Sequence, residues 1–197
     1  MKYYTDVQPG YVFNMDAQDW NRKFVIVTEG PFDAITISGV SILGSEINDI
    51  QRELIEGLNR QIIVVPDRDA PGEKLINQAI EFGSQLFDKL YENTDTEDLV
   101  LSETCYNLAV CYRYIGYELY NNVADVIQSA TDDKELIKKT LDDAESAKEY
   151  LSIAKEKFFD ASGFNPDDKT SSNYAKELSK VIKQLRKLFI PALEEKL

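Results

Sequence analysis

Two short apolar runs, each followed at once by acidic residues, constrain the fold of this chain more than any other feature. Residues 25–27 lead into Glu29, and residues 62–65 lead into Asp67 and Asp69. Apolar β-branched runs between polar residues predict strands covered on both faces, as in parallel sheets flanked by helices. The carboxyl ends of parallel strands meet at one edge, where open α/β folds bind ligands. We therefore expect the three carboxylates at one rim, with Asp67 and Asp69 on the same side of the chain and able to share a cation.

The segments around these runs predict alternating strands and helices with right-handed crossovers. A leader over residues 2–15 is expected to be a hairpin or an extended segment, and residues 40–43 are expected to form the second strand. Helices are predicted from Gly30 to about Ile37, from a cap at Ser45 to about Asn59, and from Pro71 onward. The expected fold class is a small α/β unit with a parallel sheet.

This order of elements, with Glu-Gly after one strand and Asp-x-Asp after another, resembles the Toprim domains of primases, topoisomerases and some nucleases. The segments VTEGPFDAITISGVSILGSEIND and IIVVPDRDAPGEKLINQAIEFG are most similar to the Toprim region of tailed-phage DNA primases. The resemblance covers residues 1–83. It implies that Glu29 acts as general acid or base, and that Asp67 and Asp69 help to hold Mg²⁺. Hard carboxylate oxygens suit Mg²⁺, which keeps several waters and bridges to substrate phosphates.

The resemblance ends near Gly83, where a complete Toprim domain would continue with a fourth strand. Residues 84–101 instead predict a polar, acidic connector. Residues 102–197 predict an all-α domain of three long helices, since apolar residues recur at helical spacing and the loops are short. In that domain Asp132 and Glu135 resemble a capping box, Gly163 is expected to end a helix, and Pro191 to break the last one.

The charge of the chain weighs against unaided binding of nucleic acid. The net charge is −13, and residues 1–100 carry 8 Lys and Arg against 18 Asp and Glu, a net charge of −10. Affinity for nucleic acids comes largely from Lys and Arg on phosphates. We expect metal ions to offset the carboxylates, or a second, basic protein chain to supply the surface for DNA and nucleotides, or no direct binding of DNA.

The remaining composition excludes several other sites. The chain has no His and only Cys105 and Cys111, which rules out a Cys₂His₂ or Cys₄ zinc site within it, and the two cysteines are predicted to be buried in a helix. Tyrosines between residues 106 and 120 are expected to pack in a core or a partner interface rather than to stack on bases. No segment resembles a signal peptide or a membrane span, so a cytoplasmic protein of a bacterium or a phage-infected cell is expected, without membrane partners.

Each acidic residue also has a purely structural interpretation. Glu29 is alternatively a solvated acid in a strand-to-helix loop. Asp67 and Asp69 are alternatively caps of the following helix, a role compatible with metal binding. Asp33 is assigned to the first turn of its helix, whereas Ser45 and Glu46 follow the second strand and lie within possible reach of the rim.

Three functions follow from these observations. The first is nucleotidyl or phosphoryl transfer of the Toprim type, specifically a phage-type DNA primase that joins ribonucleotides on a DNA template. The second is a non-catalytic interaction or scaffold protein, in which an incomplete Toprim unit accompanies a helical domain that binds a replication protein or another partner. The third is a Toprim nuclease, which cleavage of labelled DNA would distinguish.

Overall fold

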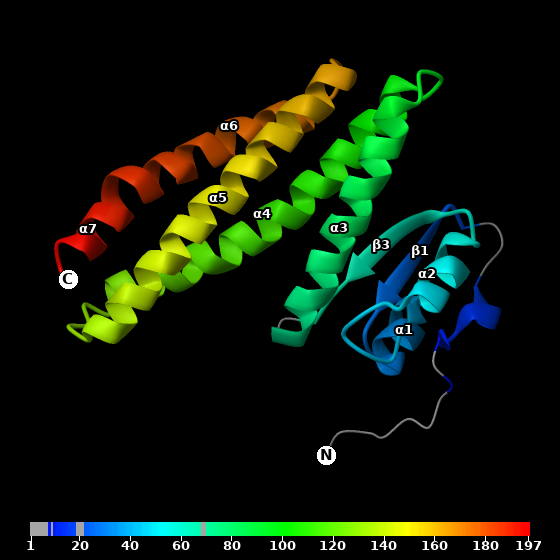
Figure 1. The fold of residues 1–197 in the computed structure, drawn as a ribbon, viewed down its shortest axis with the longest axis horizontal. Coiled ribbons are helices and arrows are strands. Elements are labelled where there is room, and N and C mark those ends of the chain that lie inside the picture. Colours follow the sequence, from blue (N-terminus) through cyan, green and yellow to red (C-terminus); the bar gives the residue numbers. More distant parts are fainter. Residues whose placement is uncertain (1–7, 9, 19–21, 68–69) are drawn as a thin grey trace. The chain divides into compact units, whose positions relative to one another are not determined.

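The computed structural model describes residues 8, 10–18, 22–67 and 70–197, and the chain divides into two compact units. Unit 1 extends to Glu81 and holds a small parallel sheet, and unit 2, Phe82–Leu197, is helical (Figure 1). Arg68, Asp69 and Trp20, like half of the predicted leader, lie outside the described residues.

The sheet of unit 1 has three parallel strands in the order β2-β1-β3. The elements of unit 1 are, in chain order, η1 (Met15–Ala17), β1 (Phe24–Thr28), α1 (Pro31–Ile37), β2 (Val40–Ser41), α2 (Asp49–Glu56), β3 (Gln61–Val65) and the start of α3 (Ala70–Glu92). The chain moves from β1 to β2 in one direction and from β2 to β3 in the other. Right-handed crossovers therefore place α1 and α2 on opposite faces of the sheet.

The core of unit 1 lies on one face of the sheet. Val25 and Val27 are fully buried there, together with Ile55 of α2 and Leu75 of α3. On the other face α1 packs against β1 and β2. The prediction of strands covered on both faces is right for β1 and wrong for β3, whose residues are largely exposed.

The helix boundaries differ from the predicted ones in ways that local chemistry explains. The N-cap of α2 is Asn48, not Ser45, because Asn48 and Gln51 form a reciprocal capping box. Residues 84–101 are mostly helical rather than a connector, since α3 continues to Glu92 and α4 begins at Asp98.

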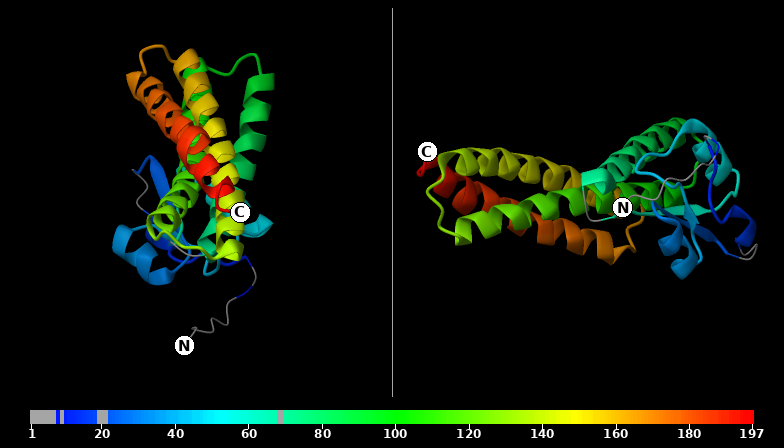
Figure 2. Two further views of the ribbon diagram at one scale, coloured as in Figure 1. Left: turned by 90° about the vertical axis from the view of Figure 1, so that its left-hand side faces the viewer. Right: turned by 90° about the horizontal axis from the view of Figure 1, so that it is seen from below.

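Unit 2 consists of the end of α3 and a run of further helices. These are α4 (Asp98–Gln128), α5 (Lys134–Phe164), α6 (Lys169–Gln184), the π-helix η2 (Leu185–Phe189) and α7 (Ile190–Glu194). α4 and α5 run side by side in opposite directions, and α6 returns along α5 (Figures 1 and 2). The N-cap of α5 is Asp133, one residue after the predicted Asp132, and α5 passes Gly163 by one residue.

The core of unit 2 combines small and large side chains. Ala144, Ala147 and Ala154 of α5 are buried in the same core cluster as Phe158, and Gly116 of α4 faces Leu151 at close range. Small residues at helix contacts let long helices approach closely. The last helix changes geometry before Pro191, where Ile190 N–H donates to Leu185 O, five residues back. Proline has no N–H to continue the regular ladder, so the preceding turn widens into a π-helix.

Candidate active site at the carboxyl edge of the sheet

Glu29 follows the last residue of β1, and buried hydroxyl groups anchor the backbone around it. Ser41 Oγ donates to Glu29 O at 2.6 Å. Thr28 Oγ1 lies 3.1 Å from Gly30 O and 3.2 Å from Val40 O, within donating distance of both. Both hydroxyl residues are almost completely buried, so these hydrogen bonds replace lost hydration and hold the turn in one conformation.

The structure brings Glu29 and Asp67 together, although 38 residues separate them. The backbone N–H of Asp67 donates to Glu29 Oε1 at 3.0 Å. The side chain of Asp67 is exposed at the same edge of the sheet. One oxygen of the Glu29 carboxylate is thus held against the chain that leaves β3.

Gly72 supports this arrangement, and the sequence analysis did not single it out. A Cβ atom on Gly72 would lie 2.0 Å from Asp67 O and 2.9 Å from Asp67 C. The first turn of α3 therefore approaches the Asp67 backbone more closely than any side chain permits. The sequence signal for this close approach was the presence of glycine two residues into a helix, where alanine is normally preferred.

The other acidic residues near this edge have structural partners. Glu46 Oε1 lies 2.9 Å from Lys74 Nζ, and both side chains are mostly exposed. Such an ion pair contributes little to stability. Asp33 lies in the first turn of α1, as expected, and its carboxylate faces Gly30.

The carboxylates of Glu29 and Asp67 are hard oxygen donors, the type of ligand that Mg²⁺ takes in proteins. Among the described residues, no group of three or more Asp, Glu or Cys side chains is placed to hold a metal. Magnesium typically takes one or two protein carboxylates and fills its remaining positions with water and substrate phosphates. Asp67 supplies one exposed carboxylate of this kind, and Glu29 lies beside its backbone.

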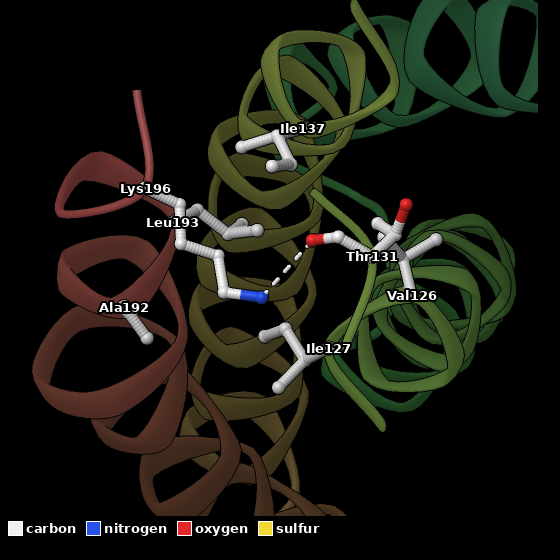
Figure 3. Close-up of a pocket in the computed structure, with 7 residues that line it drawn as sticks. All are labelled: Val126, Ile127, Thr131, Ile137, Ala192, Leu193 and Lys196. Atoms are coloured by element: carbon white, nitrogen blue, oxygen red, sulfur yellow. Dashed lines mark hydrogen bonds between the residues drawn. The ribbon is translucent and has the colours of Figure 1, made fainter. Parts of the chain in front are cut away.

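The helical unit offers a small cavity and no site of comparable chemistry. Val126, Ile127, Thr131, Ile137, Ala192, Leu193 and Lys196 surround a volume of about 30 Å³. Lys196 Nζ donates across it to Thr131 O at 3.1 Å (Figure 3). A cavity of this size accommodates water but not a nucleotide.

Four of the five tyrosines of α4 pack against the core of unit 2 and Cys105 is buried, as predicted, whereas Cys111 is only partly buried. Tyr106, Tyr112, Tyr117 and Tyr120 contact the buried core. The Arg113 guanidinium lies 4.6 Å from the centre of the Tyr174 ring, and Tyr117 Oη donates to Glu177. Desolvation by burial raises the pKa of Tyr106 and of Tyr117, and raises the pKa of Cys105 and of Cys111 to about 11. None of these groups is activated for reaction at neutral pH.

Comparisons with known proteins found no match to this chain among family models, curated proteins or solved structures. Within the part of the chain that the structure describes, every helix is too short or too polar to cross a bilayer. The functional interpretation therefore depends on the sheet, on Glu29 and on Asp67.

Proposed function

We propose that unit 1 is a Toprim-type catalytic unit for Mg²⁺-dependent nucleotidyl transfer, and that its reaction is RNA primer synthesis on a DNA template, as in tailed-phage primases. The observation that carries the proposal is the 3.0 Å hydrogen bond from Asp67 N–H to Glu29 Oε1. It joins the acidic ends of two parallel strands at the edge where open α/β sheets bind ligands.

The residues of this chain have separate tasks in the proposed reaction. Asp67, together with Asp69, holds Mg²⁺, which when bound offsets negative charge on the attacking and leaving oxygens. Glu29 accepts the proton of the attacking 3′-hydroxyl, whose oxygen bonds to the α-phosphorus as pyrophosphate leaves. The Asp67 N–H donates to Oε1 of Glu29 and so holds this carboxylate in position for the proton transfer.

The acidity of the chain implies a partner in this reaction. Residues 1–100 carry a net charge of −10, which repels a DNA template. A second, basic protein chain is proposed to hold the template, and a replication protein bound by the helical unit is the suggested source.

Glu29→Gln tests the proposed reaction most directly. The amide keeps the size of the side chain and can still accept the Asp67 N–H, but it cannot take up a proton. We expect Mg²⁺-dependent ribonucleotide incorporation on single-stranded DNA to fall about 10²–10⁴-fold. Glu46→Gln is the matched control, because Glu46 is an exposed carboxylate near the same edge and is paired with Lys74. A normal rate in Glu29→Gln, or equal losses in both variants, would refute the assignment.

A non-catalytic interaction protein is the second candidate, and the exposure of β3 favours it. Three of its apolar side chains are more than a third exposed, which is unusual for the strand of a parallel sheet. This candidate predicts no synthesis with any metal, together with a defined complex in light scattering. Cleavage of labelled DNA in Mg²⁺ or Mn²⁺, without synthesis, would instead identify a nuclease.

A further inference from the structure

α6 and the π-helix η2 that follows it are basic, although the chain as a whole is acidic. Residues 169–189 carry 6 Lys and Arg against 1 Asp or Glu, a net charge of +5, whereas the net charge of the whole chain is −13. Five of these basic residues recur along the helix and are named the basic stripe: Lys169, Lys176, Lys180, Lys183 and Lys187.

The lysines of the basic stripe lie on the outer face of α6. Spacings of seven, four and three residues return to nearly the same side of a helix with about 3.6 residues per turn. All five lysines are exposed, whereas the opposite side of α6 is buried in unit 2 through Ser171, Ala175 and Leu178. From Lys169 to Lys187 the stripe is about 27 Å long, at about 1.5 Å per residue.

Unit 2 leaves the charge of the stripe without a counter-charge. In the part of the chain that the structure describes, none of the five lysines forms an ion pair. Glu177, the acidic residue of this stretch, accepts a hydrogen bond from Tyr117 Oη at 3.0 Å and lies 3.8 Å from Arg113 Nη2, so α4 holds its carboxylate. Asp168 accepts N–H groups at the start of α6 as its N-cap. Like charges three and four residues apart on a helix repel each other, and a bound polyanion would relieve this repulsion.

The composition of the outer face indicates which polyanion fits. All apolar residues of α6 pack in or against the core: Tyr174, Ala175, Leu178, Val181 and Ile182. The outer face of α6 therefore has no apolar centre for a protein interface and no apolar side to insert into a membrane. A phosphodiester backbone needs only a row of cations, because Lys on phosphates supplies its affinity. Asn173 lies between the first two lysines of the same face and adds a donor for phosphate oxygens.

We propose that the basic stripe binds the phosphodiester backbone of a nucleic acid, without preference for its sequence. The charge of the whole chain conceals this surface, because the acidic residues are concentrated elsewhere and mainly in residues 1–100. The inference concerns unit 2 alone. It does not depend on the reaction proposed for unit 1, nor does it replace the basic partner proposed to hold the template there.

The expected binding is weak and strongly dependent on salt. Each phosphate neutralised contributes about −0.7 to the slope of log K against log salt for single strands and about −0.9 for duplexes. Five lysines therefore give a slope of at most about −3.5 for a single strand and about −4.5 for a duplex. Because the rest of the chain repels the ligand, a Kd on the order of 10 μM is expected at about 50 mM salt.

Fluorescence anisotropy of the full chain with a labelled oligothymidine and with a labelled duplex, in EDTA and over a range of salt concentrations, tests the stripe. Replacing Lys176, Lys180 and Lys183 together by Gln should weaken binding by more than about tenfold and reduce the single-strand slope by about 2. Replacing the same three residues by Arg should preserve binding, because the charges remain. All three positions are exposed, and Gln and Arg are about as favourable as Lys in a helix, so the variants should fold.

The matched control replaces Lys89, Lys138 and Lys139 together by Gln. These lysines are exposed, lie outside the stripe and change the net charge of the chain by the same amount. The control should bind almost as tightly as the wild type. Binding of either oligonucleotide with this difference between the variants supports the proposal, and the tighter ligand shows which backbone geometry fits. No binding of either oligonucleotide at about 50 mM salt, or equal losses in the two Gln variants, overturns the proposal. Binding of polyglutamate or of phosphatidylserine vesicles in place of the oligonucleotides also overturns it and identifies another class of partner.

Discussion

The approach of α3 to Asp67 can be tested by adding one methyl group, in Gly72→Ala. The new Cβ would lie 2.0 Å from Asp67 O, whereas ordinary contacts begin near 3.4 Å. The turn between β3 and α3 must therefore open by about 1.4 Å, the difference between these two distances. Because the crowded atoms are backbone, no side-chain rotation relieves the contact. The same movement pulls Asp67 N–H away from Glu29 Oε1.

The expected loss of stability follows from three contributions. Forcing extra volume into a packed site costs about 1–3 kcal/mol. Loss of a hydrogen bond to a charged acceptor costs about 1.5 kcal/mol, the lower end of the range, because this bond is exposed. Replacing glycine by alanine within a helix returns about 1 kcal/mol. The unfolding free energy should therefore fall by about 1.5–3.5 kcal/mol.

Urea denaturation at pH 7, with and without millimolar Mg²⁺, measures both consequences. Gly163→Ala is the matched control, because Gly163 is also helical and a Cβ there meets nothing within 4 Å. That variant should be unchanged or stabilised by up to about 1 kcal/mol. Any stabilisation of the wild type by Mg²⁺ should shrink in Gly72→Ala and persist in Gly163→Ala. A Gly72→Ala protein as stable as the control would refute the close approach.

Three further predictions concern unit 2. Gly116→Ala should lower stability by about 1–3 kcal/mol in urea denaturation, because its Cβ would lie 2.6 Å from Leu151 Cγ and Cδ2; a stabilised variant would contradict this packing. Asp168 is the N-cap of α6, and the hydrogen bond from the Ser171 hydroxyl lowers the pKa of its carboxyl group. The stability that this cap contributes is therefore fully present above the ordinary aspartate pKa near 3.9. It is lost as the pH falls through the lower pKa of the folded state. Asp168→Ala should thus cost about 0.5–2 kcal/mol at pH 7 and progressively less in acid, while Asp168→Asn keeps a cap and loses the pH dependence. Cys105 and Cys111, with pKa values of about 11, should resist alkylation at pH 8 until the chain unfolds, and rapid labelling of the native protein would show that one of them is exposed as thiolate.

The strands and most helices of unit 1 were predictable because their signals are local. β-branched runs marked β1 and β3, and Pro31 at the start of α1 marked its first turn. The predictions that were wrong concerned features that depend on packing between segments distant in the sequence. The exposure of β3 is set by which helices cover it, and its apolar residues are the same as those of a buried strand. The acidic composition of residues 84–101 concealed two helices, whose apolar residues pack in unit 2: Phe87 and Tyr91 both contact Phe164.

The site was predictable in part, for a similar reason. Glu29 and Asp67 each follow an apolar run, so parallel strands had to bring them to one edge. Asp67 contributes its backbone N–H to this contact. The sequence could not predict this role, because every residue except proline carries that group. Gly72 was missed because its role depends on a close approach between segments, which no local pattern encodes.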